Sequence, residues 1–209
     1  MIYAENILIC IAVPLAISVI FVRGNARRFV LAFLAGMSVC LIAAYISGFA
    51  GMTGGMEEND TAIFISPIIE EILKFLPLLF YLVLFVPESE NMFLVAAGLG
   101  AGFATFENCC HILSTGAGSL PYILIRGLAV GVMHIVSIMM LAMGLSLVRR
   151  FKAFSVAGIA GALTLSMTFH ALYNLLVSEK GISSYIGYIL PVLTAVLLYI
   201  PYRRFRSSD

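Results

Sequence analysis

Charged residues are scarce in this sequence, and their scarcity excludes an ordinary soluble domain. Asp, Glu, Lys and Arg make up 11% of the 209 residues, whereas 62% are hydrophobic. Soluble domains are about half apolar and about a quarter charged. Together with a mean hydropathy of +1.07, this composition predicts an all-α, polytopic membrane protein.

Closely paired cysteines are missing as well, and the first residues do not have the pattern of a secretory signal. The cysteines form no CxxC pair and lie in apolar segments, which predicts buried thiols rather than redox or metal sites. They are Cys10, Cys40, Cys109 and Cys110. The N-terminal MIYAENILIC lacks the basic region of a secretory signal, so we expect the first apolar segment to be retained as a span.

Seven apolar segments approach the length of about 20 residues that a helix needs to cross a bilayer. They cover residues 4–22, 29–49, 62–86, 92–113, 122–148, 153–178 and 185–201, with short connections between them. We therefore expect a bundle of about seven transmembrane helices. It forms a single membrane-embedded domain over residues 1–209, with a functional core at about 62–178.

Basic residues are concentrated in the loops after the first, fifth and seventh segments. Nine of the twelve lie there: Arg23, Arg27, Arg28, Arg149, Arg150, Lys152, Arg203, Arg204 and Arg206. With seven spans these three loops share one side of the membrane, and Lys and Arg accumulate on the cytoplasmic side. We therefore expect the N-terminus outside and the C-terminus in the cytoplasm. The acidic segment GGMEEND would then be extracytoplasmic.

Ionisable and amide side chains interrupt four consecutive apolar segments. The third to sixth segments carry Glu70, Glu71 and Lys74; Glu107, Asn108 and His111; Arg126 and His134; and His170 and Asn174. Polar groups inside a bilayer cost free energy and mark functional sites by default. The first, second and seventh segments carry almost none in their interiors. We therefore expect the central four helices to build one polar site.

Helical spacing also allows a structural interpretation of each group alone. Glu70 and Lys74 are four residues apart and share a helix face, so they could form a buried ion pair, while Glu71 points about 100° away. His170 and Asn174 have the same spacing and could form an interhelical hydrogen bond. His134 alone is typical of a hydrogen-bonded core histidine.

The depths of four groups favour a single site. At 1.5 Å per residue, Glu70, Glu107, His134 and His170 lie roughly 12, 9, 18 and 12 Å below the outer boundary. Unrelated structural polar residues would not be expected to agree in this way. The polar cluster is therefore expected in the outer half of the bilayer, with a short path to water.

The residue types of this cluster favour hydrolysis. A carboxylate and an imidazole can deprotonate water, and a histidine and an amide can stabilise an oxyanion. Aspartyl chemistry is excluded because Asp60 and Asp209 lie outside the spans. No HExxH occurs, so the usual zinc-protease helix is absent, and Ser119 lacks the GxSG context of a serine nucleophile. The alternatives are a transporter or ion-binding protein that uses the same Glu/His cluster, and a non-catalytic scaffold. A transporter should need access to both faces, whereas this polar set is one-sided.

Four motifs in order resemble the PrsW family of membrane-embedded proteases. These are EExxK at Glu70, FxxxEN at Phe103, the isolated His134, and HxxxN at His170. The family is related to the CAAX prenyl proteases and the bacterial Abi/CPBP proteins. Those relatives typically have EExxxR and FxxxH, whereas this sequence has EExxK and FxxxEN. These differences favour the PrsW branch.

The resemblance implies an intramembrane endopeptidase of a prokaryotic plasma membrane. It would cleave a single-span membrane protein, such as an anti-sigma factor, near the extracytoplasmic side by a site-1-type cut; nucleic acid is not an expected partner. By analogy, Glu70 would be the general base, with Glu107 assisting it or binding metal. His170 and Asn174 would form the oxyanion hole.

The remaining motif residues would support that chemistry. By the same resemblance, Glu71 and Lys74 would orient Glu70, Phe103 and Asn108 would be supporting residues, and the role of His134 stays open. Because the asparagine of HxxxN is a poor zinc ligand, we expect that no metal is required. The alternative is a zinc site formed by His134, His170 and Glu107 with one open position.

Overall fold

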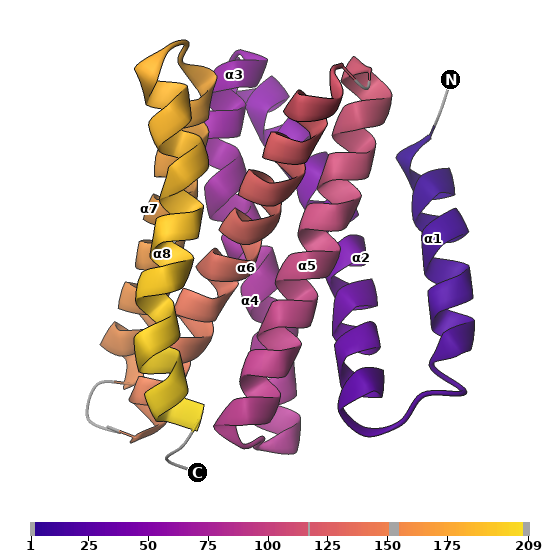
Figure 1. Cartoon of the computed structure of the whole chain (residues 1–209), viewed down its shortest axis with the longest axis vertical. Helices are drawn as coiled ribbons and strands as arrows, with labels where there is room; N and C mark the ends of the chain where they lie inside the picture. Colours follow the sequence, from indigo (N-terminus) through magenta and orange to yellow (C-terminus); the bar gives the residue numbers. More distant parts are fainter. Residues whose placement is uncertain (1–2, 117, 151–154, 207–209) are drawn as a thin grey trace.

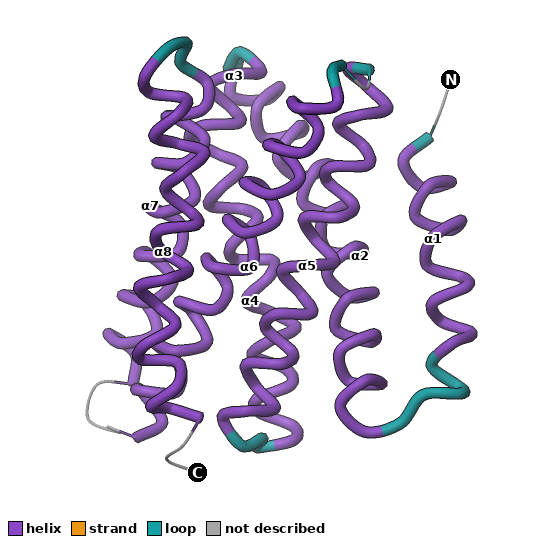
Figure 2. The backbone as a smooth tube through the Cα atoms, viewed as in Figure 1, coloured by secondary structure: helices purple, strands orange, loops and turns teal. Residues whose placement is uncertain are grey.

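The computed structural model describes residues 3–116, 118–150 and 155–206, and within them every regular element is helical (Figures 1 and 2). The elements are α1 (Ala4–Ser18), α2 (Gly24–Gly54), α3 (Glu58–Asp60), the π-helix η1 (Thr61–Ile65), α4 (Ser66–Phe85), α5 (Ser89–Thr115), α6 (Leu120–Arg150), α7 (Ser155–Ser178) and α8 (Ile182–Arg206). The predicted all-α fold is therefore confirmed.

Five of the described helices are long and apolar enough to cross a membrane: α2, α5, α6, α7 and α8. They confirm a polytopic helical membrane protein. The other two predicted spans are less typical. Helix α1 has 15 residues and is a shorter apolar helix. Helix α4 has 20 residues but carries Glu70, Glu71 and Lys74.

The helices α1, α2, α4, α5, α6, α7 and α8 run in alternating directions along the bundle (Figure 1). The N-terminus lies at one end and the C-terminus at the other. The loop from α1 to α2 lies at the same end as the C-terminus, while α3 lies at the opposite end. Of the predicted basic clusters, Lys152 lies outside the described residues, as do the side chains of Arg150, Arg204 and Arg206.

Burial is inverted relative to a soluble protein. Large apolar side chains such as Phe21 and Phe80 are 80% and 64% exposed, whereas Glu71 and Lys74 are fully buried. Apolar surface facing outward and charge facing inward fit a bundle solvated by lipid. The cysteines are unpaired; Cys40 is buried as expected, but Cys10 is exposed. Its position on the loosely packed outer helix α1 explains the difference.

The segment before α4 is helical rather than a loop. Residues 61–65 form the π-helix η1, and α4 continues from it at Ser66. Pro67 is the second residue of α4 and therefore lies just after the junction between the two helical segments. Ser66 does not cap the helix with its side chain, because the preceding turn is already helical. Short π-helices are rare and occur often at functional sites.

Glycine spacing explains the tight packing of α5 against α2. A Cβ on Gly102 would lie 2.0 Å from the carbonyl oxygen of Phe33, and one on Gly98 would lie 2.9 Å from that of Phe29. Gly98 and Gly102 form a GxxxG pair, and this pair is therefore a helix-packing site. Gly127 and Gly131 form a second GxxxG pair, which differs because a Cβ on either glycine would meet nothing within 4 Å in the described structure. That spacing does not mark a packing contact within the chain.

Candidate active site

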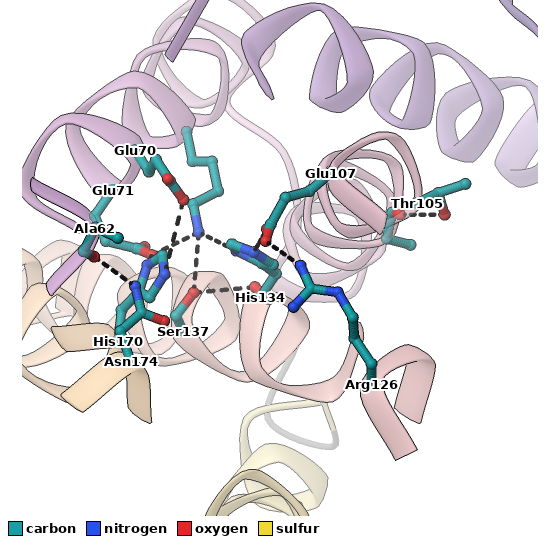
Figure 3. Close-up of polar contacts among 12 residues, drawn as sticks. Ala62, Glu70, Glu71, Thr105, Glu107, Arg126, His134, Ser137, His170 and Asn174 are labelled. Carbon is teal, nitrogen blue, oxygen red and sulfur yellow. Dashed lines mark hydrogen bonds and ion pairs between the residues drawn. The ribbon is translucent and has the colours of Figure 1, made fainter. Parts of the chain in front are cut away.

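Helices α4, α5, α6 and α7 bring the predicted polar residues into one cluster (Figure 3). Lys74 lies at its centre and is fully buried. Its Nζ is 2.5 Å from Oε1 of Glu71, 3.0 Å from Nδ1 of His134 and 3.2 Å from Oγ of Ser137. An ammonium group only donates, so all three contacts are accepted by these partners. Lys74 therefore links α4 to α6.

The buried ion pair joins Lys74 to Glu71, not to Glu70 as the helical spacing suggested. Residues three apart on a helix are neighbours just as residues four apart are, so both pairings were available. Glu71 is the fully buried member and Glu70 retains 16% exposure. The two carboxylates consequently have different surroundings.

His170 on α7 lies between these two glutamates. Its Nδ1 is 2.8 Å from Oε1 of Glu71, and its Nε2 is 3.7 Å from Oε2 of Glu70. A carboxylate only accepts, so Nδ1 donates and the Nε2 of the neutral ring carries a lone pair. Among the described residues, Oε2 of Glu70 is buried without a hydrogen-bond partner. When the His170 ring is neutral and Glu70 is ionised, a lone pair of Nε2 faces Oε2 of Glu70, and a cation could bind to both atoms.

His134 on α6 connects Lys74 to Glu107. Its Nδ1 accepts from Lys74, so its Nε2 carries the hydrogen and donates to Oε2 of Glu107. The other carboxylate oxygen of Glu107 accepts from Nη2 of Arg126 at 3.2 Å. Arg126 therefore pairs with an acidic group of the same cluster. Hydrogen bonds that involve a charged partner therefore join Lys74 to His134 and His134 to Glu107.

Two buried serines complete the network and were missed by the sequence reasoning. Ser166 on α7 donates to Oε2 of Glu71 at 2.7 Å, and it also lies 2.9 Å from the carbonyl oxygen of Ser137. Both serines are fully buried. A usable signal existed, because Ser137 is three residues after His134 and Ser166 is four residues before His170. Each serine therefore shares a helix face with a site histidine.

The predicted supporting residues lie at different distances from the chemistry. The centroids of the Phe103 and His134 rings are 4.6 Å apart, and Nζ of Lys74 lies 4.9 Å from the centroid of the Phe103 ring. Phe103 therefore packs beside the cluster and contributes a cation–π contact. Asn108 contributes no contact there, and its Oδ1 is buried without a partner among the described residues.

Asn174 lies one helical turn beyond His170, and its amide is already engaged. Its Nδ2 donates to the carbonyl oxygen of Ala62 in η1 at 2.9 Å (Figure 3). A role in binding a substrate oxyanion requires that this hydrogen bond be exchanged for one to substrate. The contact also fixes the π-helical segment to α7.

A small polar pocket adjoins the cluster on the side of Glu107. It has a volume of about 140 Å³ and is lined by Glu107, Arg126 and Asn174 together with Tyr122, Tyr173, Tyr188 and three apolar residues. Pockets with a few convergent polar groups are typical of substrate sites. The pocket has room for water or a small chemical group next to Glu107 and Asn174.

The donor set fits a metal ion. Glu70, His134 and His170 each offer one ligand atom, and these atoms lie within 4.8 Å of one another. Two histidine nitrogens and a carboxylate oxygen are typical zinc ligands. The unpaired oxygen of Glu70 and the lone pair of His170 face each other as ligands would. His134 would exchange one of its present partners for the ion.

Formal charge supports the same conclusion. Three carboxylates, those of Glu70, Glu71 and Glu107, are accompanied by two cations, Lys74 and Arg126. When all three carboxylates are ionised and both histidines are neutral, the described cluster has excess negative charge, which a divalent cation would offset. Glu107 belongs to the ligand set expected from the sequence, but here it contacts His134 while Glu70 faces both imidazoles.

Comparison with known proteins agrees with the geometry. The sequence model of the family described as PrsW family intramembrane metalloprotease matches residues 25–201. The match includes every residue of the cluster and confirms the resemblance inferred from the four motifs. No curated protein and no solved structure matches the chain.

The family description corrects one expectation, namely that no metal is required. That expectation relied on Asn174 being a poor zinc ligand. The structure gives the physical reason why it was wrong: Glu70 from α4 lies with the two histidines in a group that could hold a metal ion, so Asn174 is not needed as a ligand.

Proposed function

The chain belongs to the PrsW family of intramembrane metalloproteases and is therefore a membrane-embedded peptidase, and we propose that it cleaves a membrane-anchored protein near the extracytoplasmic side of the bilayer. The substrate class is a single-span protein, for example an anti-sigma factor, cut in a site-1-type reaction. The observation that carries the proposal is the cluster of Glu70, His134 and His170, with an unpaired carboxylate oxygen facing an imidazole lone pair.

The placement of basic residues supports this orientation. Arg27 and Arg28 begin α2, and Arg149 lies near the end of α6; both positions are at the end of the bundle that carries the C-terminus (Figure 1). Glu57, Glu58 and Asp60 lie around α3 at the other end. By the positive-inside rule the first end is cytoplasmic and the second is extracytoplasmic.

The depth of the cluster supports cleavage near the outer face. Glu70 is twelve residues after the start of α3, from which the helical chain continues through η1 into α4, and Glu107 and His170 are each eight residues before the ends of α5 and α7. At 1.5 Å per residue these positions are roughly 12–18 Å from the extracytoplasmic helix ends. Water and an extended substrate segment therefore have a short path to the site.

Glu70, His134 and His170 would hold the metal, which we propose to be zinc because of its preference for nitrogen and oxygen ligands. When bound, zinc would activate water and polarise the substrate carbonyl group. Glu71 keeps the Nδ1–H of His170 engaged, so that its Nε2 stays available. Lys74 and Ser166 hold Glu71 in turn. Such outer partners orient metal ligands and raise their basicity.

Glu107 is the group that we propose to accept the proton from water. It is 33% exposed, more than Glu70 or Glu71, and it lines the polar pocket. Arg126 keeps its carboxylate directed toward His134. This assignment differs from the sequence-based one, in which Glu70 was the base, because Glu70 faces the two histidines as a ligand would.

Asn174 would stabilise the negative charge on the substrate carbonyl oxygen. Its amide donates to the Ala62 carbonyl, so it is already oriented to donate to an oxygen atom of that type. A substrate strand that approaches beside η1 would present its own carbonyl in place of that of Ala62. Removing one oxyanion donor lowers kcat by about 10²–10³-fold in other hydrolases.

The deciding experiment separates metal binding from proton transfer. Purified full-length protein is incubated with a panel of single-span proteins tagged at both ends, and its metal content is measured. Glu70→Gln should lose both the metal and cleavage. Glu107→Gln should keep the metal while cleavage falls by about 10²–10⁴-fold, the usual contribution of a general base. Glu58→Gln, an exposed glutamate of α3, is the matched control.

The outcomes discriminate between the assignments. If Glu70→Gln keeps the metal and Glu107→Gln loses it, then Glu70 is the base and Glu107 the ligand. Cleavage that persists in strong chelators would remove the metal from the mechanism. If neither variant affects cleavage of any substrate that wild type cuts, the proposed site is wrong.

A further inference from the structure

A large groove lies at the end of the bundle opposite the polar cluster. It has a volume of about 800 Å³ and is lined by the start of α2, the second half of α4 and the first half of α5. At 1.5 Å per residue, its lining residue Phe85 is roughly 22 Å from Glu70 along α4. The groove is therefore separate from the candidate active site, and its volume is in the range of sites that hold sizeable organic ligands.

The groove is apolar along its length and basic at its mouth. Leu31 and Phe80 line it and are 49% and 64% exposed. Arg27 and Arg28 line its end, where α2 begins. An exposed apolar groove with two guanidinium groups at one end is complementary to an amphiphile that has an acyl chain and an anionic head group.

The two arginines are held differently. Nη1 of Arg28 donates to Oδ1 of Asn25 at 2.9 Å and to Oδ1 of Asn91 at 2.8 Å, which fixes its guanidinium between α2 and α5. Arg27 has no hydrogen bond or ion pair within the described residues. Glu88 also lines the groove, but in that part of the chain it forms no ion pair with either arginine. The lining therefore keeps an uncompensated positive charge.

We propose that this groove binds an anionic phospholipid, with an acyl chain along α4 and the phosphate on Arg27 and Arg28. Guanidinium groups bind phosphate oxygens with charge-assisted hydrogen bonds. The cytoplasmic leaflet is rich in anionic lipids, which attract basic residues at its surface. The proposal does not require that the polar cluster be catalytic.

Charge argues against a substrate helix as the occupant. Given the orientation proposed above, the mouth of the groove lies at the cytoplasmic face. A single-span protein carries Lys and Arg at its cytoplasmic flank. Those residues would be repelled by Arg27 and Arg28, whereas a phosphodiester would be attracted.

The test is native mass spectrometry of the full-length protein released from nanodiscs that contain phosphatidylglycerol and phosphatidylcholine in equal amounts. Wild type should retain phosphatidylglycerol in preference to phosphatidylcholine. With two surface arginines lost, Arg27→Gln/Arg28→Gln should bind phosphatidylglycerol about 30-fold more weakly. Arg203→Gln, an exposed arginine at the end of α8, is the matched control and should bind like wild type.

A second variant tests the apolar part. Ala35 lines the groove, and Ala35→Phe should reduce retention of phosphatidylglycerol while both arginines remain. Thermal unfolding of each variant verifies that it is folded. Equal retention of the two lipids by wild type would overturn the proposal, as would an arginine double variant that binds like wild type. A lipid-free dimer that Ala35→Phe converts to monomer would assign the groove to a second copy instead.

Discussion

Replacing Lys74 by methionine should destabilise the protein by about 3–5 kcal/mol, because it leaves the buried carboxylate of Glu71 without its cation. The side chains of Lys74 and Glu71 are both 0% exposed, and Nζ lies 2.5 Å from Oε1. Methionine has a similar length and fills most of the same volume. The cost therefore reports the loss of charge and hydrogen bonds rather than a cavity.

A double-mutant cycle isolates the pair. Glu71→Gln should also be destabilising, since it leaves the Lys74 ammonium buried without a carboxylate. The double variant contains neither charge, so its loss should fall short of the sum of the single losses by about 1–3 kcal/mol. The free energy of unfolding is measured by SDS titration in mixed micelles. Lys180→Met, at an exposed lysine after α7, is the control and should change stability by no more than about 0.5 kcal/mol.

Two results would refute this reasoning. If Lys74→Met costs no more than Lys180→Met, then Lys74 is not a buried, paired charge. If the two single losses add without a coupling term, then Lys74 and Glu71 do not depend on each other. Either outcome would also remove the support that the pair is proposed to provide to His170.

Three further predictions follow from other contacts. Gly102→Ala should destabilise the protein by about 1–3 kcal/mol by forcing α5 away from the α2 backbone, whereas Gly127→Ala should be neutral or slightly stabilising in the same unfolding assay. Ser166→Ala should lower metal affinity or activity by about 10–100-fold, while Thr168→Ala, an exposed residue of the same helix, should not; metal titration with activity assays checks both. Asn174→Ala should lower kcat by about 10²–10³-fold with little change in KM, and an unchanged kcat would exclude it as the oxyanion donor.

Much of the site could be predicted from the sequence because polar residues inside apolar segments are conspicuous. Glu70, Glu107, His134 and His170 were expected at one level, and the structure brings them into one cluster. The buried serines were not predicted, since serine is common in membrane helices and carries no charge to attract notice. Nor was the partner of Lys74, because helical spacing alone allows contacts with residues three and four positions away.

The sequence by itself determined the membrane class, the all-helical fold, the family and the set of residues at the polar level. These properties depend on composition, on segment length and on motifs along the chain. Only the tertiary structure decided that Glu70 lies with His134 and His170 in a group that could hold a metal ion, that Asn174 contacts Ala62, and that Gly98 and Gly102 pack while Gly127 and Gly131 do not. Such choices depend on the rotation of each helix about its axis and on its distance from its neighbours, which are set by packing between helices.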